Sequence, residues 1–367
     1  MGLDKFDIAI IGGGIAGLSS AIQCAQGGLK VGVYERGTYP KHKVCGEYIS
    51  RESLVLLQSF GLDIDSKGLP QIDRFRLTDR FGNNSECELN PGGFGWSRYQ
   101  FDDWLRKQAK ELGVYVSEGA SIRSQSGSYK EGFRLSHAKD DLCEARLVLD
   151  ASGRMPHVTP RKSDVSWVGI KYHVVSGPES NYIEIHAFDD GYAGISQVED
   201  GKYCLCYLVK SEQLKKHGSI EALERNVLAK NDSLSKRLKA ERIMGPITTS
   251  QFYFGVNSSA TERSVGDAAG FIPPLTGNGM SLALRGSKVI SNLSQRLLSG
   301  EIQYDQYCFE SNQYRNDYLN KRLRKGIVLQ DLLFLKPEAI NRVMMSFFSH
   351  SPWALRQMTA MAVGDTI

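Results

Sequence analysis

The chain lacks the features that place a protein in a special class: a large charge of one sign, paired cysteines and long apolar runs. Lys and Arg total 45 against 41 acidic residues, and a net charge of +4 is too small to indicate nucleic-acid binding. Seven scattered cysteines without a recognisable signal peptide indicate a reducing, cytoplasmic setting. No apolar run reaches the ~20 residues of a membrane-spanning helix. The 367 residues therefore suit one large globular domain or two intertwined ones.

What the sequence does have is a strand, a glycine-rich turn and a helix close to its N-terminus. Residues 6–11 form an apolar run typical of a buried parallel strand. Gly12, Gly14 and Gly17 follow with the spacing of a dinucleotide-binding turn. The first glycine permits the tight turn, the second lets the backbone approach a pyrophosphate, and the third lets the helix pack closely on the strand.

The helix after this turn offers free N–H groups and partial positive charge, so Ile15 and Ala16 are expected to contact the cofactor. Glu35 ends the second strand, residues 29–34, where its carboxylate can accept the two hydroxyls of an adenosine ribose. The same carboxylate would repel the 2′-phosphate of NADP, and the neighbouring Arg36, also expected at the cofactor, offsets this only slightly. The turn therefore predicts a dinucleotide with an unphosphorylated ribose.

A second segment, residues 264–270, combines Gly266 and Asp267 and precedes a helix. It resembles the second FAD fingerprint of the para-hydroxybenzoate hydroxylase superfamily. The resemblance implies that Asp267 binds the ribityl chain and that the helix N-terminus faces the flavin pyrimidine. A helix N-terminus there stabilises the negative charge of a reduced flavin. The cofactor-binding residues expected around this turn are Pro274, Gly277, Asn278, Gly279 and Met280.

Two further positions are similar to motifs of the same superfamily. Asp150 and Gly153 follow a buried strand, like the middle motif shared between FAD and nicotinamide binding; a plain strand-ending turn is the alternative. Arg98 is placed like the arginine that contacts the flavin before a helix, although a solvated arginine at a helix start would look the same. With these, the resemblance extends over about residues 6–290 and implies FAD as the cofactor.

The predicted fold class is α/β: a Rossmann-like FAD-binding domain of the glutathione reductase type 2, with an inserted antiparallel β-sheet substrate domain and C-terminal helices. Residues 166–209 alternate between apolar and polar, which indicates an antiparallel sheet with one exposed face. The predicted boundaries are 1–70, 97–160 and 257–300 for the FAD-binding domain, 71–96 and 161–256 for the substrate domain, and 301–367 for the helical segment.

The clearest clue to the reaction is the loop of residues 43–50, which looks like the Cys-Gly loop of the geranylgeranyl reductase family. The resemblance implies that Cys45 and Gly46 lie beside the isoalloxazine ring. Cys45 is the one catalytic candidate, as a proton donor or as a side chain that only packs on the ring. Glu47 and Tyr48 lie either near the reaction centre or in solvent. His173 and His186, on predicted strands, face the substrate or are structural.

These features predict an FAD-dependent oxidoreductase that takes electrons from NAD(P)H or another reductant and reduces double bonds of a hydrophobic isoprenoid or alkyl-chain substrate. Residues 191–196 lack the Phe-Pro pair of lipid-reducing members, which leaves the substrate open. An aromatic monooxygenase is the first alternative. A flavin halogenase is disfavoured because no Trp-x-Trp-x-Ile-Pro stretch occurs. A non-catalytic flavoprotein is the third.

The C-terminal part carries a basic cluster, residues 321–325, beside apolar residues at 327–335 and 347–348. Such a segment either contacts an anionic membrane, at its inner face, or docks on the core. The expected partner is a small hydrophobic molecule, with no nucleic acid and with no prediction of oligomeric state.

Overall fold

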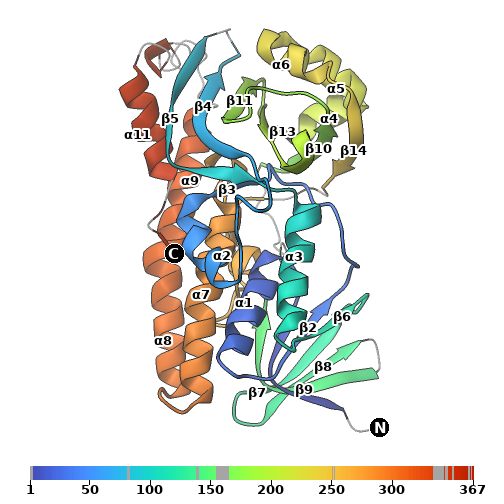
Figure 1. Cartoon of the computed structure of the whole chain (residues 1–367), viewed down its shortest axis with the longest axis vertical. Helices are drawn as coiled ribbons and strands as arrows, with labels where there is room; N and C mark the ends of the chain where they lie inside the picture. Colours follow the sequence, from blue (N-terminus) through green and yellow to red (C-terminus); the bar gives the residue numbers. More distant parts are fainter. Residues whose placement is uncertain are drawn as a thin grey trace.

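The computed structural model describes residues 3–80, 83–137, 140–153, 165–249, 251, 253–333, 343, 346–348, 351–362, 364 and 366–367. Two β-sheets lie at opposite ends of the molecule, and long C-terminal helices run along one side (Figure 1). The predicted residues 334–335 of the C-terminal segment lie outside the described part of the chain.

The first sheet carries the glycine turn. In spatial order its strands are β6 (Tyr115–Glu118), β2 (Val31–Glu35), β1 (Asp4–Ile11), β9 (Asp140–Asp150), β8 (Gly132–His137) and β7 (Ser124–Ser128). The first four are parallel, and β8 and β7 continue the sheet as antiparallel strands. Ala9 and Ile10, which point to opposite faces of β1, have no exposed surface, so both faces are covered, as expected for a continuous apolar strand.

Helices α1 (Ile15–Gln26), α3 (Arg98–Glu111) and α7 (Gly279–Leu298) share one apolar core with this sheet. Small residues let α1 and α7 approach closely: the hydroxyls of Ser19 and Ser287 lie 2.7 Å apart. Gln295 on α7 also donates to the Gln23 carbonyl at 2.9 Å. This packing joins the N-terminal turn to a helix that begins more than half the chain later.

The second sheet is larger. Its strands, in spatial order, are β14 (Arg242–Thr248), β10 (Trp167–Val174), β13 (Tyr203–Lys210), β12 (Gly191–Gln197), β11 (Tyr182–Phe188), β4 (Gln71–Thr78), β5 (Asn84–Gly95) and β3 (Tyr48–Ser50). Neighbouring strands are antiparallel except for β11 and β4, which are parallel.

The strands within residues 166–209 pair antiparallel, as expected, and β4 adds a parallel neighbour from outside that range. The expectation of one exposed face was wrong. All eight residues of β10 are buried, because α4 (Ser211–His217), α5 (Ile220–Asn226) and α6 (Asp232–Leu238) cover the outer face. Leu223 and Leu234 from these helices are fully buried there. The other face of β10 lies against the loop that contains Cys45.

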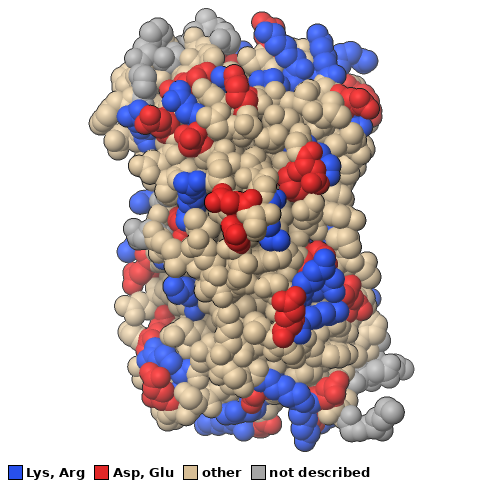
Figure 2. Space-filling model, in the orientation of Figure 1, with Lys and Arg blue, Asp and Glu red and all other residues tan. Residues whose placement is uncertain are grey.

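Short elements and C-terminal helices complete the chain. They are η1 (Arg51–Ser53), α2 (Leu54–Ser59), η2 (Glu199–Gly201), η3 (Leu228–Lys230), β15 (Gly255–Val256), η4 (Gly266–Ala268), β16 (Gly270–Phe271), η5 (Pro274–Thr276), α8 (Tyr304–Tyr314), the π-helical η6 (Arg315–Leu319), α9 (Asn320–Leu333) and α11 (Pro352–Ala362). Over the described residues, no helix has both the length and the apolar character needed to cross a membrane. Figure 2 shows positive and negative side chains interspersed over the face in view.

Candidate active site

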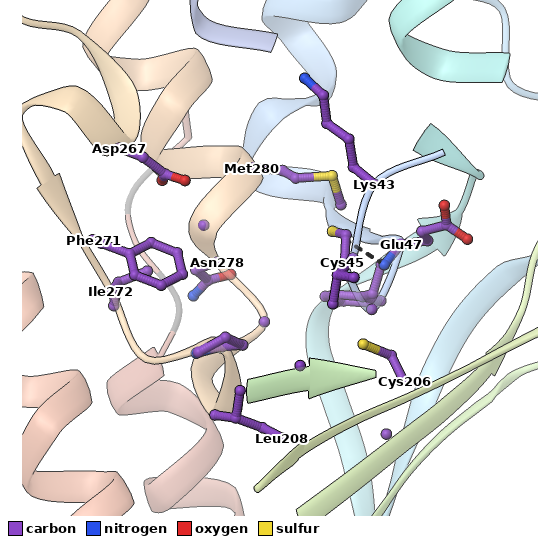
Figure 3. A pocket seen from close by; sticks show the side chains of 18 of the residues that line it. Lys43, Cys45, Glu47, Cys206, Leu208, Asp267, Phe271, Ile272, Asn278 and Met280 are labelled. Carbon is purple, nitrogen blue, oxygen red and sulfur yellow. Dashed lines mark hydrogen bonds between the residues drawn. The ribbon is translucent and has the colours of Figure 1, made fainter. Parts of the chain in front are cut away.

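A cavity of about 1130 Å³ opens between the two sheets. This volume exceeds that of most small-molecule sites, which reach about 1,000 Å³. Its walls come from the glycine turn, the loop of residues 41–48, the turn at 151–153, strands β11 to β13 and the segment from 265 to 283 (Figure 3). The cavity therefore has room for a large cofactor together with a second molecule.

The glycine turn forms one end of the cavity. Gly12 has φ +99°, and a Cβ there would lie 2.3 Å from the Ala151 carbonyl oxygen. A Cβ on Gly17 would lie 1.9 Å from the Gly12 oxygen, so this close packing of helix on turn excludes every side chain. Gly14, Ile15 and Ala16 line the cavity, and α1 begins there without a side-chain cap. Free N–H groups at a helix start suit a pyrophosphate.

Glu35 lies where an adenosine ribose would be held. Its carboxylate accepts hydrogen bonds from Gly13 N and Gly37 N, both at 2.8 Å, and pairs with Lys41. Burial opposes ionisation, but the Lys41 and Gly37 donors outweigh it and lower the pKa of Glu35. Glu35 and the neighbouring Arg36 both line the cavity, and their predicted contacts with the cofactor stay a prediction.

Two cations share one buried carboxylate on the cavity wall. Arg98 binds Asp102 through two hydrogen bonds of 2.7 Å, and Lys43 Nζ lies 3.2 Å from the same carboxylate. Asp102 has no exposed surface, while Arg98 and Lys43 line the cavity. The wall thus carries an excess positive charge that suits a pyrophosphate. Sequence reasoning missed Lys43, although its place two residues before Cys45, in a loop near the glycine turn, was the available signal.

The second glycine segment meets the first from the opposite side. Gly266 has φ +65°, and a Cβ there would lie 2.7 Å from Ala16 Cβ, so the two segments touch through glycine. Asp267 lines the cavity, and α7 begins at its wall without a side-chain cap hydrogen bond. Figure 3 shows Asp267, Asn278 and Met280 around this end. The predicted cavity residues of this segment are Asp267, Pro274, Gly277, Asn278, Gly279 and Met280.

Three predicted cofactor residues are not on the cavity wall: Gly17, Gly266 and Asp150. The two glycines act by allowing close backbone packing. Asp150 accepts a hydrogen bond from Ser152 N at 3.0 Å and so shapes the turn. Ala151, Ser152 and Gly153 line the cavity next to it, and the predicted contact of Asp150 with the cofactor stays a prediction.

The Cys45 loop forms the wall between the two sheets. Cys45, Gly46, Glu47 and Tyr48 all line the cavity. Glu47 and Tyr48 are buried, with 0% and 7% exposure, so the alternative of solvated side chains was wrong. Burial of Tyr48 raises its pKa. In Figure 3, Cys45 and Cys206 both carry their sulfur atoms on this wall.

The Glu47 carboxylate is fully occupied by donors. Lys171 Nζ and the Arg98 amide, the latter at 2.6 Å, donate to Oε1, and His173 Nε2 lies 2.6 Å from Oε2. His173 is therefore structural, as is His186, which is held by Thr78 and Glu184.

Glu47, His173 and Cys204 bring three ligand-type atoms within 4.8 Å of one another. The Lys171 ammonium on Glu47 already supplies positive charge there, which favours an ion pair over a metal ion.

Beyond the Cys45 loop the cavity wall turns apolar. This apolar arm comes from residues of six strands (β4, β5, β11, β12, β13 and β16), from Phe254 and Leu275 outside the strands, and from C-terminal residues. Its members are Phe75, Leu77, Leu89, Ile183, Ile185, Tyr192, Leu208, Phe254, Phe271, Leu275, Leu329, Phe348 and Met358. Sequence reasoning did not find the arm. The alternation of apolar and polar residues is visible in the sequence, but strand pairing decides which face of each strand is turned to the cavity.

Comparisons with known proteins agree with this site. A family model described as FAD dependent oxidoreductase matches residues 7–44. A probable electron transfer flavoprotein-quinone oxidoreductase of Escherichia coli is 31% identical over 214 residues, 55% of this chain and 49% of that protein. A menaquinone reductase of Mycobacterium tuberculosis is 27% identical over 159 residues, 41% of this chain and 38% of that protein. The chain thus spans about half, or less, of the length of these relatives.

Solved structures share the whole fold at low identity. A flavin-dependent brominase has a TM-score of 0.79 at 16% identity, covering 98% of this chain and 93% of that one. A geranylgeranyl bacteriochlorophyll reductase-like protein from Thermoplasma acidophilum has a TM-score of 0.77 at 16% identity, covering 100% and 97%. At these identities the likeness shows the fold alone, and it confirms the predicted fold class. The glycine cradle, the open helix start and the cationic wall fit FAD, and the same turn is similar to the family model described as FAD dependent oxidoreductase.

Proposed function

We propose that the protein uses FAD to reduce carbon–carbon double bonds in a substrate with an isoprenoid or alkyl chain, with electrons from NAD(P)H or another reductant. The observation that carries this proposal is the apolar arm, which continues from the Cys45 loop. The charged residues among the described cavity residues lie at the end of β2, in the Cys45 loop, at the start of α3 and in the second glycine segment: Glu35, Arg36, Lys41, Lys43, Glu47, Arg98 and Asp267.

The arm suits a chain that offers no hydrogen bonds. Burying apolar surface is worth about 0.8 kcal/mol per methylene group, so a prenyl or alkyl chain gains affinity from the arm alone. A charged substrate group would lose its hydration there without a partner. The arm therefore selects long apolar molecules over compact phenols, the substrates of the aromatic monooxygenase alternative.

The residues of the chain have separate tasks in such a reaction. FAD, when bound, supplies a hydride to the substrate carbon. The N-terminus of α7 lies at the cavity and stabilises negative charge on its ligand. Cys45 holds an exchangeable proton at Sγ on the same wall, and its sulfur accepts the Glu47 N–H at 3.4 Å. Apolar side chains of the arm exclude water from the reacting carbons.

The relatives support a prenylated ring compound as one form of substrate. Two are named for quinones, and menaquinone joins a ring to a polyprenyl chain. A substrate of this kind resides in lipid, so peripheral membrane contact belongs to the proposal. Val328 and Trp353 are large apolar residues that are 57% and 68% exposed. They lie on α9 and α11, the helices that also contribute Leu329 and Met358 to the arm.

A single-turnover experiment tests the proposal. FAD-loaded protein is reduced with dithionite without oxygen, mixed with a prenylated quinone or a prenyl diphosphate, and the product is examined by mass spectrometry. The proposal expects reoxidation of the flavin and a gain of two hydrogen atoms on the chain. Addition of an oxygen atom to an aromatic ring when air is admitted, with no reduction of prenyl chains, would establish the monooxygenase instead.

A further inference from the structure

The loop that carries Cys45 is fastened to the second sheet at several points. Lys171 Nζ on β10 donates to the Lys43 carbonyl at 3.2 Å, and Cys204 Sγ on β13 donates to the Cys45 carbonyl at 3.3 Å. The loop ends at Glu47, whose carbonyl accepts Trp96 N at 3.0 Å. Strands far apart in the sequence therefore hold this loop by its backbone.

Glu47 adopts a backbone conformation that a side chain normally avoids. Its φ is +58°, in the left-handed region, which is unfavourable for a residue other than glycine. Such a conformation persists where the surroundings enforce it. Here they do, because the carboxylate is held by Lys171, His173 and the Arg98 amide. The contacts of this one side chain determine the direction in which the loop leaves the sheet.

The burial of this ion pair is better explained by geometry than by stability. Glu47 and Lys171 have no exposed surface. Removing two charges from water costs nearly as much as their attraction returns, so an apolar pair of similar volume is often equally stable. A buried pair that adds little net stability can still fix one arrangement of the chain.

Glu47 is not suited to donate protons. Burial opposes its ionisation, but Lys171 and His173 outweigh burial and lower the pKa of Glu47. Both carboxylate oxygens already accept hydrogen bonds. Cys45, two residues earlier, also lines the cavity and carries its thiol on this wall.

We propose that Glu47, held by Lys171 and His173, is a positioning residue that fixes the Cys45 thiol against the flavin on the cavity wall. The inference rests on the proposed function, because it concerns the same site. It adds a specific task for three side chains that do not themselves react.

The test measures how well bound FAD shields Cys45 from iodoacetamide, followed by mass spectrometry of the peptide. The variant is the charge-balanced pair E47Q/K171M, which removes both charges together. Glu184→Gln is the matched control, since Glu184 is also a buried carboxylate on this sheet, held by Arg237 at 2.9 and 3.0 Å. We expect FAD to shield Cys45 in the wild type and the control, and to shield it poorly in E47Q/K171M although FAD still binds.

Equal shielding in wild type and E47Q/K171M, or equal loss in Glu184→Gln, would overturn the proposal. Should the double variant fail to fold, His173→Phe replaces it: the Lys171 pair remains, but Oε2 of Glu47 loses its donor. His173→Gln, which keeps an amide donor, should then restore shielding, and its failure to do so would count against the proposal.

Turnover separates this inference from the proposed function. A shift of a reacting group by roughly 1 Å lowers kcat by about 100-fold. We therefore expect E47Q/K171M to have a lower kcat, with the same KM for a prenyl substrate as the wild type. If the wild type binds FAD, shields Cys45 and yet reduces no prenyl substrate, the substrate proposal fails and the positioning role stands. A higher KM for the prenyl substrate in E47Q/K171M, with kcat unchanged, would contradict the positioning role.

Discussion

Replacing Lys171 by Met tests the energetics of the buried cluster. Met fills most of the space of the lysine stem but removes the ammonium that contacts Glu47. The carboxylate, 0% exposed, then keeps only His173 and the Arg98 amide as donors. Breaking one side of a buried ion pair costs about 3–5 kcal/mol, and the two remaining donors place this variant near the lower end, about 3 kcal/mol.

The loss depends on pH with a definite sign. In the wild type the pKa of Glu47 lies below its ordinary 4.5, so its stabilisation is present above that value and is lost as the pH falls through the folded-state pKa. Without Lys171, burial dominates and raises the pKa of Glu47 above 4.5, so the variant becomes less stable as the pH rises. The difference in unfolding free energy should therefore be larger at about pH 8 than at about pH 5.

Urea unfolding at saturating FAD, followed by tryptophan fluorescence at both pH values, measures this difference. Lys202→Met is the matched control, because its pair with Asp200 is solvent-exposed, with side-chain exposures of 39% and 59%. Loss of such a pair changes stability by less than about 1 kcal/mol. A cost for Lys171→Met no larger than that of the control, or a larger cost at the lower pH, would refute the reasoning.

Three further substitutions test the cavity. Gly17→Ala should abolish FAD binding in an absorbance titration, because its Cβ would lie 1.9 Å from the Gly12 oxygen; retained affinity would contradict the cradle. Lys43→Met should weaken FAD binding about tenfold, and more at low salt, because it removes the ammonium that pairs with Asp102 on the cavity wall. An affinity that does not depend on salt would count against this. Gly194→Phe should obstruct the apolar arm and suppress turnover of long-chain substrates, with FAD affinity unchanged. Gly194→Ala is the control and should behave as wild type, because its Cβ would lie 3.4 Å from the nearest atom. Normal turnover by the Phe variant would exclude the arm as the substrate site.

The parts of the site that sequence reasoning found are those encoded by neighbouring residues. The glycine turn, Glu35 and the start of α7 each combine a strand end, a turn and a helix start within a short stretch. Local steric rules and helix-end electrostatics apply to such stretches directly, and residues of the first and last segments line the cavity; their contacts with the cofactor stay a prediction. The role of Asp150 was open to two interpretations, because a carboxylate after a strand can also accept a hydrogen bond from the backbone of its own turn, as it does here.

The surroundings of Cys45 show which part of the site the sequence could not predict. The resemblance implied that the loop lies at the reaction centre, but the sequence left Glu47 either near that centre or in solvent, and His173 either facing the substrate or structural. The ion pair joins Glu47 to Lys171, more than one hundred residues away, through the register of β10 against the loop. No sequence pattern near Glu47 or Lys171 indicates that the two side chains meet in the fold.

The sequence alone determined that the N-terminal turn suits a dinucleotide, because the geometry of such a turn is local, and its resemblance to a known superfamily implied FAD. Only the tertiary structure decided what lies opposite that cofactor. The apolar arm and the Glu47 cluster are assembled from strand faces and loops that meet after sheet pairing, and a shift of one residue in register would turn each of those side chains to the other face.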